Sequence, residues 1–360
     1  IMFIKPDDIG TEITEVTDSK EYISQSAKDK ARIVPENSLL ITCIGSIGKI
    51  AINKIECAFN QQINAIIPNS KIYSSKYLGY AIVKNRRELE AIANAPVVPI
   101  INKTQFSEFE VIIHDEIEEQ KKTVEILDKA QELIDKRKAQ IEALDELVKS
   151  KFIEMFGDPA VNPMGWPEGT IRDIVTEVRY GTSRPAVEGG KYKYLRMNNI
   201  TYNGELDTSD LKYIDIPDKD LEKYIVRKGD VLFNRTNSKE LVGKTCVFNL
   251  DEPMVIAGYI IRIRMNERAL PEYLSAVLNS KYGKQVLYGM CKTIVGQANI
   301  NAQELQDIKI FIPPIELQKQ YVDFIKQVEK IKSEMKNSLK ELENNFNSLM
   351  QKAFKGELFN

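Results

Sequence analysis

Two long stretches without glycine or proline constrain the fold of this chain more than any other feature of its sequence. Residues 117–156 and 315–354 carry apolar side chains three or four positions apart, with one interruption at Arg137, and charged and amide side chains lie between. A narrow apolar seam on a long helix predicts a coiled-coil partner rather than a broad core. The two stretches also share residues, since 117–121 (IEEQK) aligns with 315–319 (IELQK). We therefore expect two antiparallel rods of about 60 Å, with Ile134 near Asn337.

The segments that precede these helices also repeat. Gly48-Lys49 stands before apolar residues 50–52, as Gly243-Lys244 stands before residues 245–247. The other matched segments are predicted strands at 65–67 and 259–261, helical stretches at 76–87 and 271–288, and predicted strands at 109–113 and 308–312. A repeat of roughly 195 residues indicates a domain duplication rather than a solenoid.

The predicted fold class is α+β. We expect two similar mixed α/β globular domains separated by two long helices that form an antiparallel coiled coil, with pseudo-two-fold symmetry. The expected boundaries are 1–113 for the first domain, 114–157 for the first helical spacer, 158–313 for the second domain and 314–360 for the second spacer. The segment Trp166–Gly190 has no match in the first domain, and the chain starts at Ile1 rather than Met. We therefore expect the first domain to be truncated at its beginning.

The composition offers little for catalysis. His114 is the one histidine, and Cys43, Cys57, Cys246 and Cys291 form no C-x-x-C pair, so they read as buried thiols of a reducing compartment. The string at residues 243–245 (GKT) is a poor phosphate loop, because the first glycine is missing and a strand follows. The net charge of −2 argues against nucleic-acid binding unless the basic residues gather on one face.

Several motifs occur in a fixed order. They are 228–233 (KGDVLF), 242–244 (VGK), 296–300 (GQANI), 312–318 (IPPIELQ) and the paired helix ends 152–158 (FIEMFGD) and 350–358 (MQKAFKGEL). With these motifs the whole chain resembles the specificity (S) subunit of type I restriction-modification systems. The first domain departs from the pattern at residues 96–99 (PVVP), which stand where the second domain has Gly296-Gln297, and at His114-Asp115. These departures make base contacts harder to place in the first domain.

The resemblance implies a DNA-recognition subunit rather than an enzyme. It implies a bipartite target read by two target recognition domains, with double-stranded DNA, two methyltransferase subunits, and restriction or translocase subunits as partners. No cofactor or metal is expected in this chain, whereas S-adenosylmethionine, ATP and magnesium are expected on partner subunits. The implied location is the cytoplasm of a bacterium or archaeon, with no membrane attachment.

Sequence-specific contact needs Arg, Lys, Asn and Gln at base edges and Ser, Thr and Lys at phosphates. The polar run 234–239 follows a predicted strand, where a rigid scaffold would present it. The second domain offers Thr182, Ser183, Arg184, Arg196, Asn198, Arg235, Asn237, Ser238, Lys239, Lys244, Gln297 and Asn299, and the first offers Lys5, Ser46, Lys49, Gln61, Gln62 and Asn102. The alternative for each is a solvated polar turn or a helix cap.

Two classes of function stay open on the sequence alone. The first is a bipartite DNA-recognition subunit that holds modification and restriction partners together. The second is an adaptor without enzymatic activity whose duplicated domains bind other proteins, which the acidic isoelectric point favours. Duplex DNA binding with a steep salt dependence by the assembled complex would separate the two.

Overall fold

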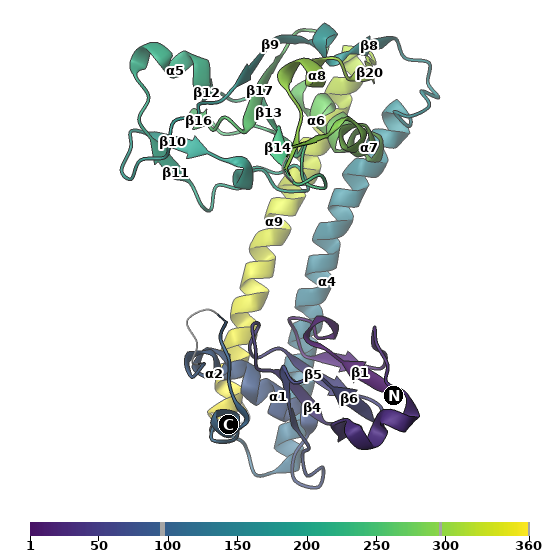
Figure 1. Cartoon of the computed structure of the whole chain (residues 1–360), viewed down its shortest axis with the longest axis vertical. Coiled ribbons are helices and arrows are strands. Elements are labelled where there is room, and N and C mark those ends of the chain that lie inside the picture. Colours follow the sequence, from purple (N-terminus) through teal and green to yellow (C-terminus); the bar gives the residue numbers. More distant parts are fainter. Residues whose placement is uncertain (94–97, 295–296, 359–360) are drawn as a thin grey trace. The chain divides into compact units, whose positions relative to one another are not determined.

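The computed structural model describes residues 1–93, 98–294 and 297–358. The chain folds into two compact units, the first made of Ile1–Gln140 and Met335–Asn360 and the second of Ile141–Glu334. Each unit therefore contains one globular domain and one part of each of two long helices, labelled α4 and α9 in Figure 1. Within the described residues, no helix is both long enough and apolar enough to cross a membrane.

The long helices have the bounds that the sequence predicts. Helix α4 spans Ile117–Phe156 and helix α9 spans Ile315–Phe354, with 40 residues each. Helix α4 ends immediately before Gly157, which has a φ of 81°, and helix α9 ends two residues before Gly356, which has a φ of 75°. Side chains with a Cβ avoid this conformation, so a glycine here lets the chain leave the helix without strain.

The two helices pack antiparallel within each unit, as predicted. In the second unit the rings of Phe152 and Tyr321 lie 5.7 Å apart, and Asp145 of α4 accepts a bond from Lys332 of α9. In the first unit Leu127 of α4 shares a buried cluster with residues near the end of α9. The expected register is wrong, because pairing Ile134 with Asn337 would place Asp145 opposite Lys326. Asp145 instead contacts Lys332, which lies six residues further along α9, and six residues are more than one helical turn.

A buried lysine joins the helix pair to the second domain. Lys332 is only 3% exposed, and its ammonium contacts Asp145 of α4 and lies 2.6 Å from a carboxylate oxygen of Glu205. Glu205 belongs to a loop of the domain, so three separate segments meet at one charge. A buried ammonium needs such partners, because an unpaired charge in the interior is strongly unfavourable.

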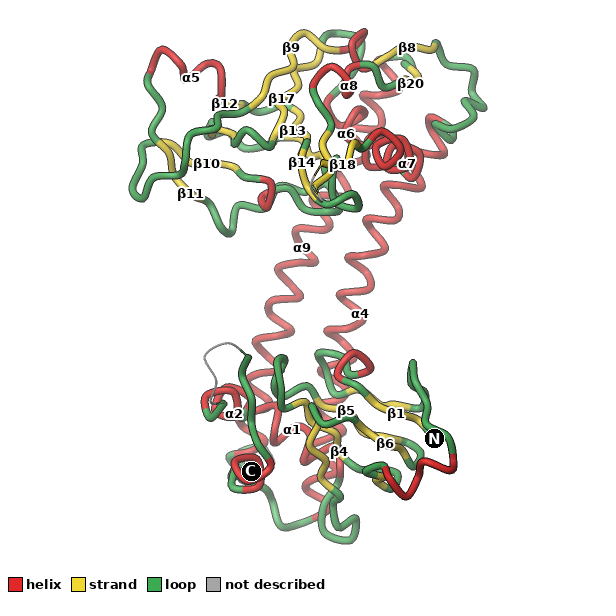
Figure 2. The backbone as a smooth tube through the Cα atoms, viewed as in Figure 1, coloured by secondary structure: helices red, strands yellow, loops and turns green. Residues whose placement is uncertain are grey.

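The first domain combines two small sheets with short helices (Figure 2). One sheet has the order β1-β6-β3 and the other the order β2-β5-β4-β7. Its strands are β1 Met2–Ile4, β2 Thr14–Val16, β3 Ile33–Val34, β4 Leu39–Thr42, β5 Ile50–Asn53, β6 Cys57–Phe59 and β7 Ile63–Ile66, and its helices are η1 Pro6–Asp8, η2 Gln25–Lys30, α1 Ser75–Lys84, α2 Arg86–Ala91 and α3 Lys103–Ser107. Strands β4 and β5 are buried on both faces, which explains their continuous apolar runs.

The second domain repeats this plan and adds to it. Its sheets have the orders β11-β10-β16-β12, β15-β13-β17-β9, β14-β19-β18 and β20-β8. The strands are β8 Glu168–Thr170, β9 Val175–Tyr180, β10 Tyr192–Leu195, β11 Lys212–Ile214, β12 Ile225–Val226, β13 Val231–Asn234, β14 Thr236–Asn237, β15 Thr245–Val247, β16 Met254–Ile256, β17 Ile260–Met265, β18 Lys292–Ile294, β19 Gln297–Asn299 and β20 Lys309–Phe311. The helices are η3 Ile171–Ile174, η4 Met197–Asn199, α5 Asp218–Tyr224, α6 Pro271–Asn279, α7 Lys281–Met290 and α8 Ala302–Gln306.

The duplication is visible strand by strand. The order β5-β4-β7 in the first domain matches β15-β13-β17 in the second, and β1-β6-β3 matches β10-β16-β12. The predicted strand at 109–113 is wrong, since that segment forms no regular strand. Its counterpart β20 pairs with β8, which belongs to the opening segment of the second domain. No described residue of the first domain matches this opening segment, so the partner strand is missing there.

The two predicted helical stretches between the sheets and the spacers are each broken into two helices. Asn85 separates α1 from α2, and Ser280 separates α6 from α7. Ser280 has an extended backbone, and its hydroxyl accepts a bond from the Gly283 N–H as the N-cap of α7. A residue that caps a new helix cannot continue the preceding one, which explains the break.

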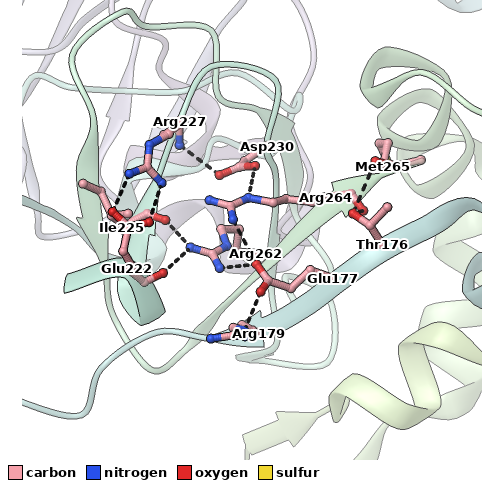
Figure 3. A network of polar contacts seen from close by, with 10 residues as sticks. All are labelled: Thr176, Glu177, Arg179, Glu222, Ile225, Arg227, Asp230, Arg262, Arg264 and Met265. Carbon is pink, nitrogen blue, oxygen red and sulfur yellow. Dashed lines mark hydrogen bonds and ion pairs between the residues drawn. The ribbon is translucent and has the colours of Figure 1, made fainter. Parts of the chain in front are cut away.

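A network of charged side chains joins the sheets of the second domain (Figure 3). Arg262 of β17 is fully buried and contacts the carboxylate of Glu177 on β9 and the carbonyl oxygen of Ile225 on β12. Arg264 reaches Asp230 at 3.0 Å and Glu177 at 3.1 Å. These contacts link a strand of one sheet to the edge strand β12 of another, so they fix how the sheets meet.

The histidine and the cysteines have structural surroundings. The His114 ring lies 2.7 Å from the carbonyl oxygen of Ala353, as expected for a structural histidine. Cys43, Cys57 and Cys246 are buried free thiols, whereas Cys291 is half-buried. Burial raises the pKa of the Cys57 thiol to about 11, which keeps it protonated and unreactive at neutral pH.

Candidate nucleic-acid interface

The ends of β9 and β13 and the start of β17 lie at the same edge of a sheet in the second domain, and predicted contact residues meet there. Arg235 follows β13, and its backbone N–H donates to the carbonyl of Tyr259, the residue before β17. The Arg235 guanidinium lies 4.8 Å from the ring centre of Tyr180 at the end of β9, and it donates to the side-chain oxygen of Asn299 at 2.9 Å. We call Tyr180, Arg235, Tyr259 and Asn299 the Arg235 cluster. It contains two residues that the sequence predicts, Arg235 and Asn299.

The Arg235 guanidinium is held in place without being neutralised. Across the described ranges no ion pair involves Arg235, and its Nε is buried without a hydrogen-bond partner. A tyrosine face and an amide oxygen orient the planar group but leave its charge uncompensated. Tyr180 is 40% exposed, and Tyr259, whose carbonyl accepts the Arg235 backbone N–H, is 53% exposed. A preoriented, uncompensated guanidinium against an exposed tyrosine ring suits recognition of a guanine edge or a phosphate.

The loop after β14 carries a second basic group. The Lys239 ammonium lies 4.1 Å from the ring centre of Tyr288 on α7. Asn237 accepts a bond from the Ser238 backbone N–H at 2.8 Å, which shapes the turn that presents Lys239. Asn237 and Ser238 are thus partly engaged within the loop, in agreement with the polar-turn alternative. Gln297 lies in β19, but its side chain is outside the described part of the structure.

Other predicted contact residues are already paired or buried. Arg196 forms an ion pair with Asp210 at 2.7 Å, Arg184 lies 3.8 Å from Asp220, and the Lys5 ammonium contacts Glu21. Thr182 and Lys244 are only 3% and 9% exposed. Asn102 is the N-cap of α3, since its side-chain oxygen accepts a bond from the Gln105 N–H at 2.9 Å.

These placements correct part of the sequence prediction. A direct DNA contact would require Thr182 to become exposed, because its side chain is in the interior. Asn102 fits the capping alternative, because its side chain already satisfies an N–H at a helix start. Ser183, in a loop, and Asn198, in the short helix η4, are by contrast exposed.

Two segments of the chain, residues 3–143 and 163–344, match a family model described as type I restriction modification DNA specificity domain. The chain belongs to this family. The matched segments contain the two globular domains, so each is a specificity domain, and the resemblance drawn from the motifs is confirmed together with a role in DNA specificity.

Relatives and solved structures agree with this assignment. The EcoKI specificity subunit of Escherichia coli K12 is 26% identical over 92% of this chain and 76% of its own length. The StySPI specificity subunit of Salmonella potsdam is 23% identical over the same shares. A solved structure described by the assembly and conformational transition of the type I R-M system aligns with a TM-score of 0.62 at 18% identity, covering 99% of this chain and 91% of that chain. A type I S subunit from M. genitalium aligns with a TM-score of 0.52 at 16% identity, covering 98% and 92%.

The two specificity domains share one backbone frame but differ in the side chains at the reading edge. Cys43 takes the place of Arg235, because the Cys43 N–H donates to Gln62 and its carbonyl accepts from Ile101, as Arg235 bonds to Tyr259 and Ile300. Gln62 therefore occupies the position of Tyr259. The bridge between Ile44 and Ile100 matches the pairing of Thr236 with Asn299. The first specificity domain thus presents an amide and apolar groups where the second presents an arginine.

Gln62 and its neighbour Gln61 are two of the predicted DNA contacts of the first specificity domain. The side-chain oxygen of Gln62 accepts a bond from Asn60 at 3.0 Å, so its amide orientation is fixed, while Gln61 is exposed. Ser46 and Lys49 border a cavity in the same domain. Only Gln62 lies at the position that corresponds to the Arg235 cluster.

The sequence prediction missed the tyrosines of this interface. Tyr180 and Tyr288 face Arg235 and Lys239, and Tyr259 is exposed beside them. A usable signal is present, since Tyr180 precedes Gly181 and Tyr259 follows Gly258. Aromatic rings between basic residues are typical of nucleic-acid surfaces, so the tyrosines at these strand ends could have been included among the candidates.

Proposed function

We propose that this chain reads a bipartite double-stranded DNA target, one half with each specificity domain, and that it performs no catalytic step itself. The observation that supports this best is the exchange of Arg235 for Cys43 and of Tyr259 for Gln62 on one hydrogen-bonded frame. Identical scaffolds with different side chains at one edge suit two readers of different base sequences. Arginine favours guanine, whereas glutamine favours adenine and apolar groups favour the thymine methyl.

The proposal assigns chemistry to other subunits. Two methyltransferase subunits, held by the helical spacers, would carry S-adenosylmethionine, and restriction or translocase subunits would carry ATP and magnesium. The relatives' names place their proteins in type I restriction enzymes, which supports these partners. The cytoplasm of a bacterium or archaeon, where the DNA is found, is the proposed location.

The test is reconstitution of the chain with its methyltransferase subunits. We expect duplex binding that weakens steeply with salt and methylation at a split target in mapped host DNA. The purified chain alone should show no methyl transfer, nuclease or ATPase activity. Methyl transfer by the chain alone would contradict its non-catalytic role. Failure of the complex to bind duplex DNA, with capture of protein partners intact, would favour the adaptor alternative.

A further inference from the structure

The Gly-Lys turn has the same geometry in both specificity domains. Gly48 and Gly243 both have a φ of 78°. The Gly48 N–H donates to Thr42 at 2.9 Å, and the Gly243 N–H donates to Asn234 at 2.8 Å. Thr42 and Asn234 are the last residues of the matching strands β4 and β13. A turn shared by the two domains in both dihedral angle and hydrogen bonding positions the following lysine in the same way.

Each of these lysines reaches back to an equivalent segment of its own domain. The Lys49 ammonium lies 3.5 Å from the carbonyl oxygen of Ile9, and the Lys244 ammonium donates to the carbonyl oxygen of Met197 at 3.0 Å. Ile9 follows the short helix η1, and Met197 begins the matching helix η4. Carbonyl oxygens orient an ammonium group but do not neutralise its charge.

A second cation approaches each turn from the helix pair that packs beside it. Arg86 begins α2, and its side chain passes so close to Gly48 that a Cβ there would lie 3.0 Å from the Arg86 Cγ. Lys284 of α7 donates to the Gly243 carbonyl and to the Asn279 side-chain oxygen, both at 3.0 Å. Each specificity domain therefore gathers two basic side chains at one turn. We call Lys49 with Arg86, and Lys244 with Lys284, the paired cations.

The paired cations lack carboxylate partners. In residues 1–93, 98–294 and 297–358, none of the four forms an ion pair, and the Arg86 Nε is buried without a partner. In the first domain they border a cavity of about 430 Å³ together with Thr11, Ser46 and Glu90. In the second domain burial, followed by the charge of Lys244, lowers the pKa of Lys284 to about 8. Two positive charges at one turn, neither of them in an ion pair, create a site suited to an anion.

We propose that each specificity domain uses its paired cations to hold one phosphodiester group of the DNA backbone. This inference rests on the proposed function, since it names a contact by which these domains would grip DNA. Phosphate contacts position a protein on the duplex without reading its sequence, which explains why this turn is the same in two domains that differ at the reading edge. Lys244 is only 9% exposed, and Lys284 beside it is half-buried, so the two side chains would have to share the contact.

The first experiment measures duplex binding by the complex of the full chain with its methyltransferase subunits at several salt concentrations. For each phosphate that a variant no longer neutralises, the slope of log affinity against log salt should become shallower by about 0.9. Arg86→Gln and Lys284→Gln should each do this, equally on target and non-target DNA, and the double variant should show about twice the change in slope. Over 50 to 200 mM salt, each single change corresponds to about a threefold smaller loss of affinity. Matched controls are Arg87→Gln and Lys281→Gln, exposed basic residues on the same helices.

A second variant should strengthen duplex binding instead of weakening it. Glu90 borders the cavity of the first domain with its own negative charge. Glu90→Gln should therefore strengthen duplex binding, and Arg86→Gln should remove that gain. Scanning single uncharged methylphosphonate linkages through each half-site should find one position at which the wild-type complex weakens. The variant of the corresponding domain should be insensitive at that position.

The outcomes separate this inference from the function on which it rests. If the wild-type complex fails to bind duplex DNA, the proposed function is wrong. If it binds the target but the folded variants keep the wild-type salt slope and methylphosphonate pattern, the paired cations hold no phosphodiester. Saturable binding of inorganic phosphate or ATP that depends on Arg86 or Lys284, with unchanged DNA binding, would identify a free anion as the ligand and overturn the assignment.

Discussion

At the scale of single residues, we propose that Arg235 is the side chain by which the second specificity domain contacts a base. Arg235→Ala should weaken target binding by about 1–3 kcal/mol if its guanidinium holds a guanine edge, and only one half-site should lose discrimination. The measurement is duplex affinity for targets with substitutions in each half-site. Arg172→Ala is the control, because Arg172 already pairs with Asp307 at 2.6 Å. Gln62→Ala should act on the other half-site, and equal loss at both halves would contradict the assignment of one half-site to each domain.

The charge of Lys284 should make DNA affinity depend on pH. Its pKa, lowered to about 8 by burial and by the neighbouring Lys244, means that the free protein loses this charge near pH 8. A bound phosphate favours the ammonium form, so binding takes up a proton and DNA affinity should fall as pH rises through about 8. Lys244 and the ring of Tyr202, 5.9 Å away, are the other titratable groups facing Lys284. Affinities at pH 7, 8 and 9 should fall less steeply for Lys284→Gln, and parallel curves would count against the prediction.

At the scale of elements, the Arg262 network holds β9, β12, β13 and β17 together. Glu177→Gln should destabilise the second unit by about 3 kcal/mol, because it leaves the guanidinium of Arg262 buried without its counter-charge. Urea unfolding followed by tyrosine fluorescence measures the change. Glu222→Gln is the matched control, since Glu222 pairs with Arg227 on the surface and should matter far less. Equal destabilisation by both variants would show that the burial of Arg262 is not what matters.

The helices and strands also show which parts of the structure can be predicted from the sequence. The bounds of α4 and α9 follow from periodicity and from glycines at their ends, which are local signals. Residues 109–113, where a strand is expected, form none. Their counterpart β20 pairs with β8, which is distant in sequence, and local periodicity cannot show whether such a partner is present. Arg235 and Asn299 were both predicted, but their contact joins residues 64 positions apart and required the fold. Tyr180 was missed because its contact with the Arg235 guanidinium also joins residues that are distant in sequence.

At the scale of the whole molecule, we propose that the length of the helix pair sets the spacer between the two half-sites. Removing 134–140 and 337–343 takes a heptad from each helix and follows the register marked by Asp145 and Lys332. Each helix becomes about 10 Å shorter, which corresponds to about 3 bp of DNA. Both half-sites should keep their bases while the spacer contracts, although the accompanying rotation of about a third of a turn will weaken binding on straight DNA.

Methylation-site mapping in cells that carry the shortened chain and its methyltransferase measures the spacer directly. Removing seven residues from α4 alone is the control, because it disturbs the register without shortening both helices. A folded double deletion that still methylates at the original spacing would show that the helices do not measure the distance.

The contact of Lys332 with Asp145 and Glu205 restricts how such proteins can be recombined. Anyone grafting a foreign recognition module onto these spacers would have to bring an acid to the place of Glu205, or else replace Lys332. A module without that acid would leave the buried Lys332 ammonium with Asp145 but without the second of the two carboxylates that contact it. Inherited or engineered hybrids should therefore retain the loop and both helical positions together, as one unit of exchange.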